Sequence, residues 1–186
     1  PGSYSEDGEI DHLCISLRDN QYNLSLELHY YVYEDTNVIT RSTKFINESS
    51  EEVKLLRLMS LQVDFATPEY VLTTFNGAWA REMRRNDIRI QAGKHVNSSY
   101  TGTSSSHANP FVMMSKEETS EDFGDCYGFN LIYSGNHYEA VEVSKFGKTR
   151  IVTGMNPQSF CFLIGEVLPT PPSQQLWPPW SAPRRR

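Results

Sequence analysis

The sequence predicts an all-β fold, an antiparallel β-sandwich, from three observations. Apolar and polar residues alternate in several short runs, which is the period of a strand with one buried face. Clusters of Asn, Asp, Gly and Ser separate these runs at regular intervals, as turns do. The chain has 186 residues, which is long enough for one domain with a substantial core.

The first two runs form the clearest pair. Apolar residues alternate over Leu13–Leu17 and again over Leu24–Val32, with the polar turn Arg18–Gln21 between them. Two runs of period two around a short turn predict a β-hairpin. We expect its leucine face to lie on the core, while the opposite face, which includes His29 and Tyr31, is wetter.

Ten further runs have the composition of strands. They are Val38–Asn47, Val53–Phe65, Tyr70–Phe75, Asp87–Gln91, Lys94–Ser98, Phe111–Met114, Cys126–Tyr133, Tyr138–Val143, Thr149–Thr153 and Ser159–Ile164. The run over 53–65 also has good helix propensity, but its flanking strands favour the β interpretation. An Ala-Gly turn joins the runs at 87–91 and 94–98, and the strands between 126 and 153 are expected to form a meander. Residues 81–85 are expected to form a helical turn or an irregular excursion, and the hydroxyl-rich stretch 97–106 a flexible loop.

Residues 169–186 differ in composition from the β domain over 1–168. They hold six of the ten prolines and two of the three tryptophans. Proline cannot donate to a sheet ladder, so the repeated Pro-Pro pairs are expected to exclude a central strand. We interpret this tail as disordered or foreign to the fold. The alternative is a polyproline II ligand for an aromatic groove.

Charge and cysteine content limit the partners. The net charge of -6 argues against nucleic acid, and the only dense basic run is Arg184–Arg186. No apolar run approaches the ~20 residues of a membrane span, so no membrane partner is expected. Cys14, Cys126 and Cys161 make neither a disulfide framework nor a metal pattern. We expect them to be buried apolar residues in a reducing, cytoplasmic compartment.

No catalytic constellation emerges from the residues alone. His107 follows three serines, but no Gly-x-Ser-x-Gly elbow is present, so a serine hydrolase is disfavoured. The five histidines lack metal-ligand spacing, and no Gly-rich phosphate loop precedes a helix. We therefore expect no catalytic residues, no metal and no cofactor.

Two stretches mark a special loop region. In the first, Asn76-Gly77 readily takes positive φ, so the chain turns or bulges there, and Trp79 and Arg81 follow directly. A tryptophan and a guanidinium so placed can anchor a packing surface or a ligand. The second stretch, 104–111, carries His107, Asn109 and Phe111.

Five collinear segments resemble the N-terminal domain of family 36 glycoside hydrolases, the α-galactosidases or melibiases. They are 33–42, 75–82 (Phe-Asn-Gly-Ala-Trp-Ala-Arg-Glu), 102–111, 127–136 and 147–157. The resemblance runs from about Ser5 to about Val167. It implies the large β-sandwich, or supersandwich, seen also in galactose-mutarotase-like proteins.

The resemblance also implies where the chemistry is done. Enzymes of this family hydrolyse terminal α-galactosides, such as melibiose and raffinose, with two aspartates on a separate (β/α)8 barrel. The Lys-Trp-Asp type motif of the nucleophile does not occur here, and no barrel follows. We expect a fragment of the N-terminal domain, truncated at both ends relative to the family and inactive alone.

The implied role is architectural. The domain would brace the catalytic barrel of the same parent enzyme and aid homo-oligomer assembly. We expect Trp79, Arg81, His107, Asn109 and Phe111 at a barrel-facing or inter-subunit surface. The alternative places Trp79 and Phe111 in the core, with His107 and Asn109 holding the loop by local hydrogen bonds.

Two other functions stay open. A free-standing carbohydrate-binding module would bind galactosides through exposed aromatic and amide side chains. A mutarotase-like isomerase would need an acid/base pair in a cleft, and the sequence alone does not assemble one.

Overall fold

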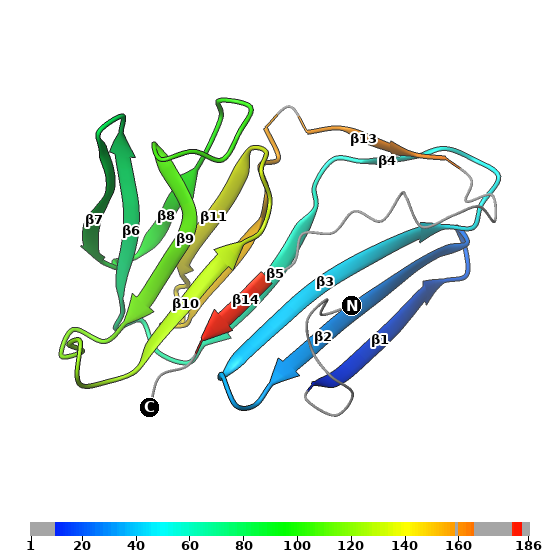
Figure 1. Cartoon of the computed structure of the whole chain (residues 1–186). Coiled ribbons are helices and arrows are strands. Elements are labelled where there is room, and N and C mark those ends of the chain that lie inside the picture. Colours follow the sequence, from blue (N-terminus) through cyan, green and yellow to red (C-terminus); the bar gives the residue numbers. More distant parts are fainter. Residues whose placement is uncertain (1–9, 159, 166–179, 184–186) are drawn as a thin grey trace.

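The computed structural model describes residues 10–158, 160–165 and 180–183, in which all regular structure is β (Figure 1). The strands are β1 (Asp11–Asp19), β2 (Leu24–Tyr33), β3 (Val38–Asn47), β4 (Val53–Leu55), β5 (Met59–Phe65), β6 (Val71–Ala78), β7 (Arg81–Arg89), β8 (Gly93–Ser98), β9 (Ala108–Ser115), β10 (Cys126–Leu131), β11 (His137–Val143), β12 (Thr149–Met155), β13 (Phe162–Ile164) and β14 (Trp180–Pro183). Among these residues there is no helix with the length and apolar character to cross a membrane.

The strands form three antiparallel sheets. The long sheet has the order β1-β2-β3-β14-β10-β9-β6-β7, the second sheet β5-β12-β11-β8, and a ribbon pairs β13 with β4. Figure 1 shows the four-stranded sheet lying against the end of the long sheet that holds β10, β9 and β6, while β1 to β3 extend away from it. The predicted all-β antiparallel sandwich is confirmed.

The hydrophobic core lies between the two larger sheets. Alternate residues of the facing strands point inward and contribute the apolar side chains of the core. The buried cluster consists of Leu61, Tyr70, Leu72, Ile90, Val112, Met114, Phe129, Val141 and Ile151. Burying each large side chain contributes about 1.5–3 kcal/mol, so this end of the sandwich carries most of the hydrophobic stabilisation.

The predicted first hairpin is present, but its leucine face is not buried. Strands β1 and β2 pair in register from Asp11↔Val32 to Asp19↔Leu24. The carboxylate of Asp19 caps the turn, because Oδ1 accepts the backbone N–H of Gln21 at 2.8 Å. Leu13 and Leu17 nevertheless remain 56% and 51% exposed. The four-stranded sheet covers the other end of the long sheet, so the expectation of core packing is wrong here.

Several predictions made from local sequence are wrong, because the strands pair with other partners than expected. The run over 53–65 divides into β4 and β5, which pair with β13 and β12 in different sheets. Residues 81–85 form no helical turn, because they pair with β6 as the first part of β7. The Ala-Gly turn after β7 carries the chain to the other sheet. Similarly, β11 pairs with β12, but β10 belongs to the long sheet, so there is no meander.

The tail contains a central strand. Residues 180–183 form β14, which pairs with β3 on one side and β10 on the other. The exclusion of a central strand is therefore wrong for these four residues. Pro183, the only proline among them, is the last residue of β14 and pairs with Val38. The rest of 169–186 lies outside the described residues.

The predicted burial of the cysteines is also wrong. Cys14 and Cys161 are exposed and Cys126 is half-buried. Cys14 lies on β1, beyond the part of the long sheet that the second sheet covers. Cys161 precedes the short ribbon strand β13, which lies outside the sandwich core.

Candidate functional site

The tip of the β6–β7 hairpin presents an almost fully accessible tryptophan. Trp79 and Ala80 form the two-residue turn, and Trp79 is 91% exposed. Ala80 has a φ of 60°, a conformation uncommon for residues other than glycine. The carboxylate of Glu82 holds this conformation, since its Oε1 accepts the N–H of Ala80 at 2.8 Å. The Asn76-Gly77 pair forms a bulge, with a register shift between Asn76 and Ala78.

The second predicted stretch lies directly beside this hairpin. Asn76 Nδ2 donates to the carbonyl oxygen of His107 at 3.1 Å. The rings of Phe75 and Phe111 stack with centroids 5.7 Å apart. Strand pairing of β6 with β9 continues the contact. The structure therefore brings together the two stretches that the sequence singled out.

The five predicted interface residues differ in exposure. Trp79, Arg81 and His107 are exposed, whereas Asn109 and Phe111 are half-buried. Trp79 is therefore not a core residue. Phe111 packs on a neighbouring ring, and Asn109 Nδ2 lies 3.1 Å from the sulfur of Met83. Their assignment to a subunit or barrel interface remains a prediction.

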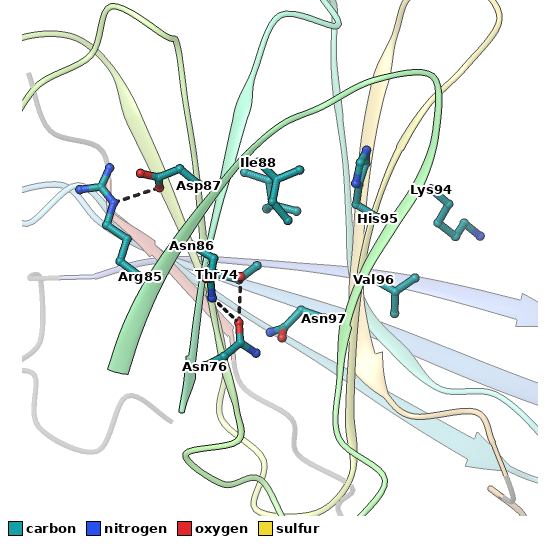
Figure 2. A pocket seen from close by; sticks show the side chains of 11 residues that line it. Thr74, Asn76, Arg85, Asn86, Asp87, Ile88, Lys94, His95, Val96 and Asn97 are labelled. Atoms are coloured by element: carbon teal, nitrogen blue, oxygen red, sulfur yellow. Dashed lines mark hydrogen bonds and ion pairs between the residues drawn. The ribbon is translucent and has the colours of Figure 1, made fainter. Parts of the chain in front are cut away.

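A cleft opens between β6–β7 and β8, with a volume of about 790 Å³ (Figure 2). β7 and β8 are the last strands of their sheets, so the sandwich is open on this side. The cleft is lined by Leu72, Thr74, Asn76, Arg85, Asn86, Asp87, Ile88, Lys94, His95, Val96 and Asn97.

Hydrogen bonds fix the orientation of three amides in the cleft. Asn76 Oδ1 accepts from Thr74 Oγ1 at 3.1 Å and from Asn86 Nδ2 at 2.9 Å. Asn97 Nδ2 donates to the carbonyl oxygen of Asn109 at 2.8 Å. Within the described chain, neither Asn86 Oδ1 nor Asn97 Oδ1 takes part in a hydrogen bond. The acceptor of Asn86, an exposed residue, is available to a ligand, whereas Asn97 is only 5% exposed.

The charged side chains at the rim of the cleft form pairs. Arg85 Nε lies 2.9 Å from Asp87 Oδ1, and Lys94 Nζ lies 3.3 Å from a carboxylate oxygen of Glu142. The hydrogen bonds from Arg85 and from Thr73 lower the pKa of Asp87 below its usual value. Each charge thus has an opposite partner, and the rim has no unbalanced charge.

Two titratable groups lie buried on β11, and one of them contacts a residue that lines the cleft. His137 and Glu139 point inward from β11, with 0% and 2% exposure. Glu139 Oε2 accepts from Asn97 Nδ2 at 2.7 Å. Burial raises the pKa of Glu139 to about 8, against the opposing effect of this hydrogen bond, and burial lowers the pKa of His137 to about 4. Both side chains are therefore mainly neutral at pH 7.

No local motif in the sequence points to these two residues. Their burial could have been inferred from their position. Residues 137 and 139 alternate with Val141 along the same strand, so all three point to the same, buried face. Three buried atoms of this region have no hydrogen-bond partner: His137 Nε2, Glu139 Oε1 and Thr153 Oγ1. In the described ranges, no three His, Cys, Asp or Glu side chains come together in a way that could hold a metal ion.

Comparison with known proteins gives a consistent result. Residues 1–164 match a family model described as the glycosyl hydrolase family 36 N-terminal domain. The chain is 39% identical over 174 residues, 92% of its length, to alpha-galactosidase AgaA of Geobacillus stearothermophilus, of which this covers 24%. It is also 39% identical over 155 residues, 83% of its length, to alpha-galactosidase Mel36A of Lactobacillus acidophilus, covering 21% of that protein.

Solved structures resemble the fold equally well. The crystal structure of AgaA aligns with a TM-score of 0.90 and 35% identity, covering 98% of this chain and 25% of AgaA. A variant of AgaA in complex with raffinose aligns with the same values. The chain therefore spans about a quarter of the length of these relatives.

Proposed function

The chain belongs to the glycosyl hydrolase family 36 N-terminal domains, and from this we propose that it is the non-catalytic N-terminal domain of an α-galactosidase. The parent enzyme hydrolyses terminal α-galactosides, raffinose among them. Its partner is the catalytic barrel of the same enzyme, and the domain aids assembly of a homo-oligomer. The names of the relatives and the raffinose complex of one of them support the substrate class.

The observation that carries the bracing role is the exposed tryptophan on a hydrogen-bonded turn at the hairpin tip. Trp79 leaves 91% of its surface accessible, although the turn around it is held by the Ala80–Glu82 hydrogen bond. Because the turn backbone is already ordered, binding there does not have to pay for ordering a loop. Tryptophan and arginine are the residues most enriched at interface hot spots, and Arg81 is exposed two residues later.

The neighbouring stretch makes this tip a stable platform. Asn76 and His107 are joined by a hydrogen bond, and Phe75 stacks on Phe111 beneath the turn. Because these contacts join β6 to β9, the tip is tied to an interior strand of the long sheet. A partner that binds the tip is therefore held in a fixed position relative to the sandwich.

The test uses the full-length parent enzyme with Trp79→Ala and Arg81→Ala. We expect each variant to lose about 2 kcal/mol or more of association free energy, as hot-spot residues do. Sedimentation velocity should show smaller species, and turnover of a chromogenic α-galactoside should fall.

Phe146→Ala is the matched control, since Phe146 is an exposed aromatic side chain in the β11–β12 turn. It should leave mass and turnover unchanged. Wild-type mass and turnover in both tip variants would refute the bracing role. Release of galactose by the 186-residue chain alone would refute the non-catalytic assignment.

The structure does not favour the isomerase alternative. His137 and Glu139 are the one histidine–carboxylate pair that lies buried near the cleft, among the residues whose placement is described. Their side chains are inaccessible, and Asn97 lies between Glu139 and the cleft. A sugar ring cannot contact them without opening the core.

A further inference from the structure

We propose that the cleft between β6–β7 and β8 is a binding site for a neutral saccharide on this domain. The site does not depend on the bracing role of the hairpin tip. It is carried by the geometry of the cleft, by its fixed amides and by the pairing of its charges.

The size and lining of the cleft suit a small polar ligand. Its volume of about 790 Å³ falls within the ~300–1,000 Å³ typical of small-molecule sites. Ile88 supplies apolar surface that can contact the C–H groups of a sugar ring, while Leu72 on the neighbouring strand is buried. Ile88 is only partly covered by protein, so a ligand there would bury further apolar area.

The amides supply the hydrogen bonding that hydroxyl groups require. Each sugar hydroxyl both donates and accepts, and an amide side chain offers both functions in one plane. Figure 2 shows Asn76, Asn86 and Asn97 converging on the cleft from three strands. Thr74 and the backbone hold these amides in place, so a ligand would meet acceptors that are already oriented.

Electrostatics favours a neutral ligand over an anion or a metal ion. The positive charges of Arg85 and Lys94 are each paired with a carboxylate. An anion would have to compete with those carboxylates, and a cation would have to compete with the guanidinium at Asp87. A polyhydroxylated ligand needs neither exchange.

The experiment is an NMR titration of the 186-residue chain with raffinose, observing the side-chain amide resonances of asparagines. We expect shifts confined to Asn76, Asn86 and Asn97. Asn86→Ala removes one free acceptor, and Ile88→Trp fills the cleft. Each should weaken the apparent affinity by about tenfold or more, equivalent to losing a good contact.

Two control variants match these changes in chemistry. Asn20→Ala removes an exposed amide in the β1–β2 turn, and Leu163→Trp enlarges an exposed apolar side chain on β13. Both should bind raffinose as the wild type does. If Ile88→Trp disturbs the fold, the methyl resonances of the core residues will shift. In that case the affinity of Asn86→Ala alone tests the proposal.

Three results would overturn the proposal. The first is the absence of chemical-shift changes at the cleft amides up to the highest raffinose concentration of the titration. The second is wild-type affinity in Asn86→Ala. The third is a response of the same amides to sulfate but not to raffinose, which would make the cleft an anion site. Loss of the bracing role in the parent enzyme would affect none of these readouts.

Discussion

Glu139 illustrates how one buried residue ties stability to pH. Its carboxyl group is inside the sandwich, where the charged form is poorly solvated, so its pKa is raised to about 8 from an ordinary value of 4.5. Between these values the folded state keeps a proton that the unfolded state has released. The contribution of Glu139 to the free energy of unfolding is therefore fully present below pH 4.5. It is lost as the pH rises from 4.5 through 8. His137 acts in the acid direction, since its lowered pKa costs stability as pH falls from 6.5 through about 4.

The Glu139→Gln variant should not lose stability as the pH rises. Glutamine resembles the protonated carboxyl group and can still accept from Asn97 Nδ2. Between about pH 6.5 and 9, wild-type unfolding free energy should fall by about 2 kcal/mol, while the variant stays nearly flat. Urea unfolding followed by tryptophan fluorescence at several pH values measures this difference.

Glu142→Gln is the control, because Glu142 is exposed on the same strand. It should follow the wild-type pH profile. A parallel decline in Glu139→Gln and the wild type would show that another group causes the loss.

At the scale of elements, the β6–β7 hairpin depends on a glycine for its bulge. A Cβ placed on Gly77 would meet the backbone carbonyl oxygen of Arg81 and lie 2.9 Å from the Cα of Glu82. These are backbone atoms of the partner strand, so no side-chain rotation relieves the contact. The close approach of the two strands requires glycine here, independent of its φ.

We expect Gly77→Ala to destabilise the chain by about 1–3 kcal/mol, the usual cost of overpacking. The hairpin tip should become more mobile, with loss of the Asn76–His107 contact. Thermal unfolding gives the stability, and the amide resonance of His107 reports the tip. Gly165→Ala is the control, because a Cβ there has no neighbour within 4 Å. Equal melting temperatures for the two variants would contradict the packing argument.

At the scale of the whole molecule, β14 connects two halves of the long sheet. It is the strand between β3 and β10, so β1 to β3 join the sandwich through its backbone hydrogen bonds. A strand that pairs on both sides shields the edges of both neighbours from solvent. This segment comes from the proline-rich end of the chain.

Deleting 166–186 should therefore expose the edges of β3 and β10. We expect faster hydrogen exchange for amides in 38–41 and 130–131, with unchanged exchange in the β12 segment 150–153. A chain that lacks only Arg184–Arg186 keeps β14 and should exchange like the wild type. Unaltered protection of 38–41 after the larger deletion would show that β14 does not join the two halves in solution.

Local patterns were sufficient for most of the strands. Strand β3 begins and ends at the predicted residues, and the β1–β2 hairpin forms around the predicted turn. Alternation and turn residues act over a few positions, so they can be read without knowing the partners. The five-segment resemblance added the family and the sandwich, because collinear motifs carry information beyond alternation. The candidate interface residues were chosen in the same way, through Trp79 and its neighbours, and their interface role stays a prediction.

By itself, then, the amino-acid sequence determined that this chain is a set of antiparallel strands of the family 36 N-terminal type. Only the tertiary structure decided which sheet each strand joins, that Leu13 is uncovered, that Glu139 is buried and that β14 lies centrally. It alone also placed Asn86 and Asn97 on facing strands of one cleft. The physical reason is that pairing, burial and clefts depend on contacts between residues far apart in the chain, whose free energy no short stretch contains.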